Sequence, residues 1–135
     1  MLSEIAIRTQ TQGLTEITTY LNQALAKHEL MEGLCTVFIK HTSASLIIQE
    51  NADPSAKRDL EVWLNRLVRE DDELYTHTLE GADDMPAHIK SILTSTSLSI
   101  PFSERRLLLG TWQGVYLWEH RHHGGNRQII IHSGA

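Results

Sequence analysis

The segment from Tyr75 to Lys90 has the residue types of a site that binds a metal ion or a charged substrate. Within this short stretch lie two histidines and three carboxylates, His77, His88, Glu80, Asp83 and Asp84. A solvated loop has no need of this mixture. Two further polar clusters, at 41–45 and 110–121, lie directly beside apolar, strand-like runs. Because rigid elements support functional side chains at their ends, we expect the three clusters to form one composite site.

Three histidines from separate segments, His41, His77 and His88, could supply imidazole ligands to a catalytic metal with an open coordination position. Their spacing matches no contiguous metal motif, so the alternative is three unrelated histidines, exposed or hydrogen-bonded. Imidazole ligands favour a divalent ion such as zinc over magnesium, because magnesium prefers oxygen ligands. Magnesium is not excluded. Glu80 or Glu119 is the predicted general acid or base, or orients a ligand.

Hydroxyl, amide and guanidinium groups in the same clusters predict an assembled anion site. No Walker-type loop and no Gly-x-Gly-x-x-Gly is present. Hydrogen bonds and charge would come from Thr42, Ser43, Ser45, Thr111, Gln113, Arg121 and Arg127. Such a set fits a phosphorylated small molecule. Trp112, inside the turn 110–114, is expected to anchor that turn in the core.

Two other arrangements are weaker. His120 and His122 would share one face of a strand and could chelate a metal, but we favour an exposed hairpin end beside 124–125. A Ser-His-Asp triad would need Ser43 or Ser45 with His88 and Asp83. We disfavour it because the sequence has no Gly-x-Ser-x-Gly elbow.

Composition restricts the class of protein. The 135 residues predict a single domain, 1–135, and the net charge of −5 argues against a nucleic-acid partner. The one cysteine, Cys35, allows no internal disulfide and is expected to be a small buried hydrophobic residue rather than a nucleophile. There is neither a secretory signal nor an apolar run of about 20 residues, so we expect a cytoplasmic protein with no membrane partner.

The elements that position these clusters are strands with interspersed helices. Apolar and β-forming residues predict strands at 4–9, 34–40, 46–50, 98–102, 107–109, 115–123 and 127–132, the last two joined as a hairpin by Gly124-Gly125. One helix is predicted at 17–25, capped by Thr15, and a second after Asp53-Pro54, with the apolar stripe Leu60, Trp63, Leu64, Leu67 and Val68. A third opens at Pro86, with His88 in its first turn. The lack of βαβ alternation predicts an α+β protein with a largely antiparallel sheet or sandwich.

The clusters, in this order, resemble the YjbQ family, also called the secondary thiamine-phosphate synthase family. The resemblance covers nearly the whole chain and rests on the combination of six segments, none of them specific alone. These are His41–Ser45, Glu50–Pro54, Tyr75–His77, Glu80–Ser91, Leu109–Gly114 and Glu119–Arg121.

The resemblance implies a compact α+β protein with a β-sandwich-like core, flanking helices and homotrimeric assembly. It places His41, His77 and His88 at a metal or substrate site, and it matches His120 and His122 to variable positions. It also implies a thiamine phosphate synthase activity, in which hydroxymethylpyrimidine diphosphate joins a thiazole phosphate and releases diphosphate.

We therefore expect a small metal-associated enzyme acting on a phosphorylated small molecule. The alternative is a non-catalytic metabolite- or metal-binding protein that uses the same histidine-lined pocket. A third hypothesis is a structural trimer whose histidines line a subunit interface. The pattern leaves open the physiological substrate, and whether the site lies within one subunit or across two.

Overall fold

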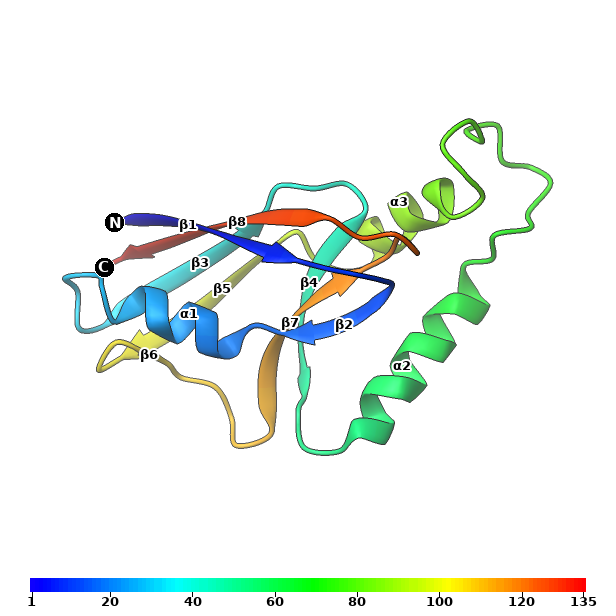
Figure 1. Ribbon diagram of the computed structural model, residues 1–135. Helices are drawn as coiled ribbons and strands as arrows, with labels where there is room; N and C mark the ends of the chain where they lie inside the picture. The colour runs from blue at the N-terminus through cyan, green and yellow to red at the C-terminus, as the bar shows by residue number, and fades with distance from the viewer.

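The computed structural model describes residues 1–135 as two sheets that face each other (Figure 1). Every strand pair is antiparallel. The five-stranded sheet has the order β1 (Leu2–Arg8), β8 (Asn126–Gly134), β3 (Gly33–Ile39), β5 (Ser97–Ser103) and β6 (Arg106–Leu107). The three-stranded sheet has the order β2 (Gly13–Glu16), β7 (Gln113–Glu119) and β4 (Ala44–Glu50). The α+β, largely antiparallel, sandwich-like prediction is confirmed.

The main core lies between the two sheets. Val37 and Ile131 from the larger sheet meet Leu46 and Leu117 from the smaller one, and all four are fully buried. Each such side chain contributes roughly 1.5–3 kcal/mol by leaving water. Cys35 belongs to this core, and burial raises the pKa of its thiol to about 11, so it is the small buried residue that the sequence predicts.

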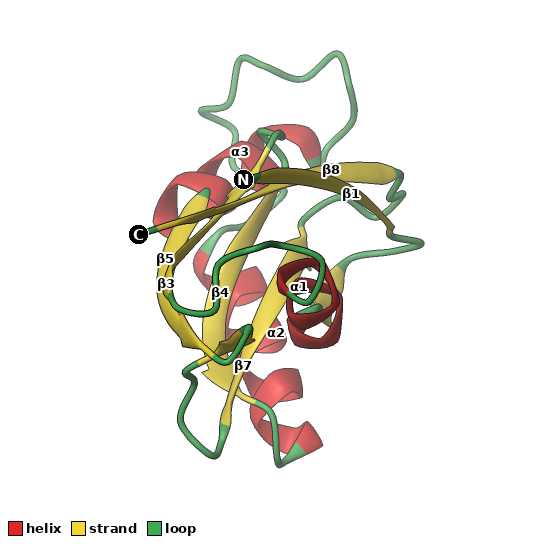
Figure 2. Cartoon of the chain, turned by 90° about the vertical axis from the view of Figure 1, so that its left-hand side faces the viewer, coloured by secondary structure: helices red, strands yellow, loops and turns green.

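Helix α1 (Thr18–Leu25) closes one open side of the sandwich (Figure 2). Its buried face, with Leu21 and Leu25 fully buried, confirms the predicted helix. The predicted cap is wrong. Thr15 lies in β2, paired with Leu117, and the helix begins after Ile17 without a side-chain cap.

Helix α2 (Pro54–Leu67) lies on the outer face of the smaller sheet (Figure 1). It begins as predicted, because the Asp53 carboxylate accepts a hydrogen bond from the Ser55 amide at 2.9 Å, with proline at the first helical position. Only one edge of the predicted apolar stripe is buried. Trp63 is 53% exposed and Leu67 is 56% exposed.

Helix α3 (Asp84–Leu93) packs beside β4 and begins two residues earlier than predicted. Pro86 is its third residue rather than its first, which is tolerated because amides in the first turn have no helical acceptor. His88 therefore lies in the second turn. None of the helices has the length and the apolar run that crossing a membrane requires.

The predicted hairpin at Gly124-Gly125 is wrong. Its two strands, β7 and β8, belong to different sheets, so the two glycines cross between sheets. Gly124 is needed there because a Cβ at this position would clash with the Thr9 carbonyl oxygen. Trp112 is also misassigned, since it is 65% exposed rather than a core anchor. The strand predicted at 107–109 ends at Leu107.

Candidate functional site

Asp84 joins two of the predicted ligand histidines into one group. Asp84 opens α3, and His88 follows one turn later on the same face of the helix. His77 comes from the loop before the helix. One oxygen of Asp84, Oδ2, lies 2.7 Å from Nε2 of His77 and 3.1 Å from Nε2 of His88. The three candidate ligand atoms lie within 4.8 Å of one another.

This group opens to solvent on one side. The side chain of Asp84 is 2% exposed, against 50% for His77 and 30% for His88. Burial by itself would raise the pKa of Asp84, but hydrogen bonds from its neighbours and the nearby cationic groups lower that pKa overall. The carboxylate is therefore an anion beneath two accessible imidazoles.

A backbone contact fixes the proton on His88. Its Nδ1 lies 3.0 Å from the carbonyl oxygen of Thr42, so Nδ1 carries a hydrogen and donates it. In its neutral form, the ring would then present the lone pair of Nε2 toward the Asp84 oxygen. Two acceptors facing each other at 3.1 Å require a proton or a cation between them.

Arg121 holds the carboxylates of this region in place. Its guanidinium donates to Asp83 at 3.1 Å, to the second oxygen of Asp84 at 2.6 Å and to the backbone oxygen of Glu80 at 2.9 Å. All three of its nitrogens are engaged, so the predicted role of Arg121 as an anion ligand would require these bonds to break. The Glu80 side chain is exposed, with its carboxylate 3.9 Å from His77.

Glu119 and Arg127 form a buried ion pair at the end of β7. Two guanidinium nitrogens of Arg127 donate to the two oxygens of Glu119, at 2.6 and 2.9 Å. Glu119 is fully buried and also accepts from the Thr9 hydroxyl and the Arg121 amide. This geometry fixes the guanidinium of Arg127 in position.

His41 lies outside the Asp84 group, between two donors. Its Nδ1 accepts from the Ser43 amide at 3.0 Å, and its Nε2 lies 2.9 Å from a guanidinium nitrogen of Arg127. Burial, and after it the Arg127 charge, lower the pKa of His41, so the ring is neutral at neutral pH. A neutral imidazole has one acceptor nitrogen, which here serves the Ser43 amide, so the Arg127 N–H faces the Nε2–H group and lacks an acceptor. An anionic oxygen would supply it.

A cavity of about 540 Å³ has both His41 and His88 in its lining. His41, Thr42 and His88 line it together with residues of α3 and of the segment after it. Ser91 is among them, and its buried hydroxyl has no hydrogen-bond partner within the chain. The cavity therefore offers donors beside both histidines.

The remaining predicted residues are distributed differently. Ser43 is buried beside His88, but Ser45 bonds to His120 and Thr94 in the interior. Gln113 is the first residue of β7 and Thr111 precedes it, so both lie at the opposite end of that strand from Glu119. Within one chain they do not reach the histidines, because seven strand residues span about 20 Å.

Two alternatives fail on geometry. His120 is buried and bonds to Ser45, whereas His122 is exposed and contacts Glu70, so neither the chelating pair nor the exposed hairpin end is formed. The triad also does not form. Asp83 pairs with Arg121, and Nδ1 of His88, already donating to Thr42, cannot accept from Ser43.

The sequence is similar throughout to proteins of one family. The family profile described as "UPF0047 protein YjbQ-like" matches residues 3–134. A UPF0047 protein from Synechocystis is 53% identical over 129 residues, covering 95% of this chain and 87% of its own. YjbQ from Escherichia coli O157:H7 is 48% identical over 110 residues, covering 82% and 79%.

Solved structures agree with the sequence comparison. A YjbQ/UPF0047 family protein from Clostridium acetobutylicum superposes with a TM-score of 0.89 at 32% identity, covering 98% of this chain and 99% of its own. A conserved hypothetical protein from Thermus thermophilus gives 0.88 at 32% identity, with the same coverage.

Proposed function

The chain belongs to the YjbQ-like (UPF0047) family, and from this premise we propose that it is a small metal-associated enzyme acting on a phosphorylated small molecule. The reaction proposed is that of a thiamine phosphate synthase, joining hydroxymethylpyrimidine diphosphate to a thiazole phosphate. Asp84, His77 and His88 would hold a divalent metal, zinc before magnesium, because two imidazoles and a carboxylate form a recurrent zinc ligand set.

The observation that carries this proposal is the hydrogen bond from Nδ1 of His88 to the Thr42 carbonyl. Metal-binding histidines almost always donate their other N–H in this way, which points the remaining lone pair at the ion. His77 and Asp84 supply two more ligand atoms close by, and solvent reaches the group from one side. His41, predicted as the third imidazole ligand, is proposed instead to bind the anion.

The anion would lie against His41 and Arg127, where one N–H has no acceptor. In the proposed reaction, the thiazole nitrogen forms a bond to the pyrimidine methylene carbon. The carbon–oxygen bond to diphosphate breaks, and its electron pair leaves with diphosphate. A metal on Asp84 would stabilise that charge. The chain's own donors would hold the phosphate oxygens, and Glu119 would keep Arg127 in position.

We test this function with three proteins purified without a tag: wild type, His88→Ala and His132→Ala. His132 is an exposed strand residue and serves as the matched control. We expect wild type and His132→Ala to bind about one metal per chain and to form thiamine phosphate from the two precursors. His88→Ala should lose both properties. Full metal content in His88→Ala would reject the ligand set.

A metal-binding wild type that forms no product would favour the non-catalytic metabolite- or metal-binding protein. The engaged arginines favour this reading, because Arg121 and Arg127 already bind internal carboxylates. A thermal shift with phosphorylated metabolites would then identify the ligand.

A homotrimer in the cytoplasm remains part of the proposal. Its support in this chain is an apolar surface on α2, α3 and the loop between them, where a groove is lined by Leu67, Leu74, Tyr75, Ile89 and Leu93. The exposed Leu67 and Leu93 suit contact with another copy. Light scattering should give three chains per particle for wild type and for Leu2→Lys, a change on an edge strand, but a smaller particle for Leu93→Lys.

A further inference from the structure

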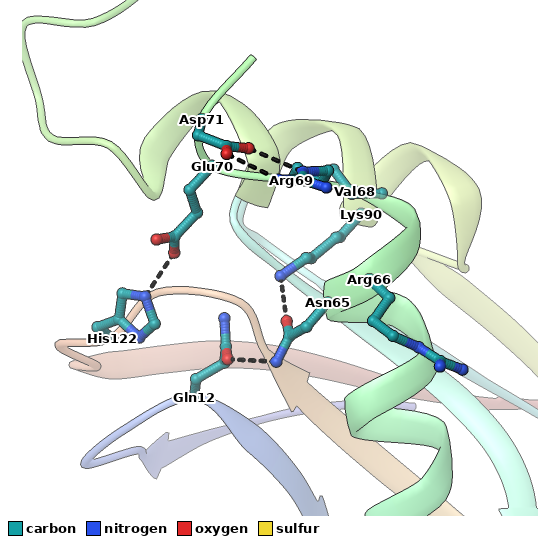
Figure 3. A pocket seen from close by; sticks show the side chains of 9 residues that line it. All are labelled: Gln12, Asn65, Arg66, Val68, Arg69, Glu70, Asp71, Lys90 and His122. Carbon is teal, nitrogen blue, oxygen red and sulfur yellow. Dashed lines mark hydrogen bonds and ion pairs between the residues drawn. The ribbon is translucent and has the colours of Figure 1, made fainter.

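A second polar cavity lies across α3 from the histidine cavity. His88 and Lys90 are two residues apart, so their side chains leave the helix about 200° apart. The cavity beside Lys90 has a volume of about 640 Å³ and lies between the end of α2, the chain that follows it and the turn after β7 (Figure 3). Lys90 is the most deeply buried of its lining residues, with 2% exposed.

The ammonium group of Lys90 pairs directly with no carboxylate: burial lowers its pKa, and the more distant charges of Glu70 and Asp83 only partly oppose that shift. Its Nζ donates to Oδ1 of Asn65 at 2.6 Å and makes no ion pair with a carboxylate. Asn65 is itself held by a bond to Gln12 at 3.0 Å. An ammonium group has three donors, so two of them are left over, and buried charges in proteins are almost always paired.

The carboxylates of the cavity are already engaged. Asp71 forms a two-bond pair with Arg69, at 2.8 Å for each bond, and Glu70 contacts His122. In Figure 3 the side chains of Lys90, Asn65, Gln12 and His122 point toward a common space. That space is therefore lined by hydrogen-bond donors and by a buried ammonium group that no carboxylate contacts directly.

We propose that this cavity binds the phosphate or carboxylate group of a small anion, with Lys90 as the cationic donor and Asn65 as its positioning residue. A compact ammonium group on a flexible stem is suited to an oxyanion of either kind. None of these residues belongs to the histidine site, so the inference goes beyond the proposed function and is independent of it.

The test is a titration of isotope-labelled, full-length protein, dialysed beforehand against a chelator, with inorganic phosphate and separately with malonate. We expect saturable shifts of the Lys90 amide and the side-chain amides of Asn65 and Gln12. Lys90→Gln should weaken binding at least tenfold, the loss expected for one charge-assisted hydrogen bond. Lys27→Gln, at an exposed position, and His88→Ala should bind as wild type does.

Saturation by phosphate alone, or by malonate alone, assigns the chemical class of the ligand. Absence of saturable shifts at these residues with both ions overturns the proposal, as does equal affinity in Lys90→Gln. Should Lys90→Gln fail to fold, the positions of the shifted residues in wild type test the proposal, because shifts confined to the histidine cavity would also reject the Lys90 site. Loss of metal binding in His88→Ala with these shifts intact would separate the two sites.

Discussion

Breaking the buried pair of Glu119 and Arg127 should destabilise the protein severely. Glu119→Gln leaves the shape of the side chain but removes its charge, so the guanidinium of Arg127, 10% exposed, loses its only counter-ion. The amide nitrogen would also face a donor, since every partner of Glu119 donates to it. Removing one partner of a buried pair costs about 3–5 kcal/mol. That is a large part of the roughly 5–15 kcal/mol by which domains are stable.

Replacing both partners should cost much less than the sum of the single changes. In Glu119→Leu/Arg127→Met no buried charge is left, and the main loss is an acceptor for the Arg121 amide, about 1–3 kcal/mol. The coupling energy between the two sites should therefore be at least about 3 kcal/mol.

Urea unfolding at pH 7 measures these energies, with all variants at one protein concentration because assembly shifts apparent stability. Single changes that cost less than about 1 kcal/mol, or an additive double variant, would refute the account of this pair as a charge that needs its counter-ion.

Three further predictions concern groups with perturbed ionisation. Burial, and after it the charge of Lys90, lower the pKa of His120 to about 3, so between pH 6.5 and about 3 only the unfolded chain binds this proton. The free energy of unfolding of wild type should therefore fall by about 2 kcal/mol as the pH is lowered to 5. In urea titrations, His120→Asn should lose this pH dependence, whereas His132→Asn should keep it. The hydrogen bond from the Ser55 amide lowers the pKa of the capping Asp53. The stabilisation by this cap is therefore full above the ordinary pKa of 3.8 and disappears as the pH falls through the lower pKa of the folded state. Asp53→Ala should lower the urea midpoint at pH 7, and its midpoint should converge with that of wild type near pH 2. Cys35, with a raised pKa and no exposed surface, should react with a thiol reagent only in denaturant, and rapid labelling of the native protein would contradict its burial.

Features with a local cause were predicted from the sequence. The Asp53-Pro54 start of α2 depends on atoms two residues apart, and the alternation in β3 reflects a buried face that repeats along the strand. The hairpin at Gly124-Gly125 failed because strand pairing is not local. Two glycines allow a tight turn, but they also allow the close approach to Thr9 that carries the chain between sheets. The two uses have the same local pattern.

The exposure of Trp63 and Leu67 has a similar explanation. A helix shows the same apolar periodicity whether its stripe packs on its own sheet or on another copy of the chain. Periodicity therefore predicts that α2 has an apolar face, but it does not predict what covers that face. In this chain Leu64 and Val68 pack inward, while Trp63 and Leu67 are left exposed.

Of the three predicted ligand histidines, His77 and His88 lie together and His41 lies apart, and the carboxylate between the first two was missed for one structural reason. By residue type alone, Glu80, Asp83 and Asp84 are equivalent in the sequence. Only the phase of α3 separates them, because a residue four positions before His88 lies beside it on one helix face. A helix that opened at Pro86 would leave Asp84 outside, with no such relation to His88. Because α3 begins at Asp84, this carboxylate, and not Asp83, lies between His77 and His88. An error of two residues at a helix start is therefore enough to hide a candidate ligand.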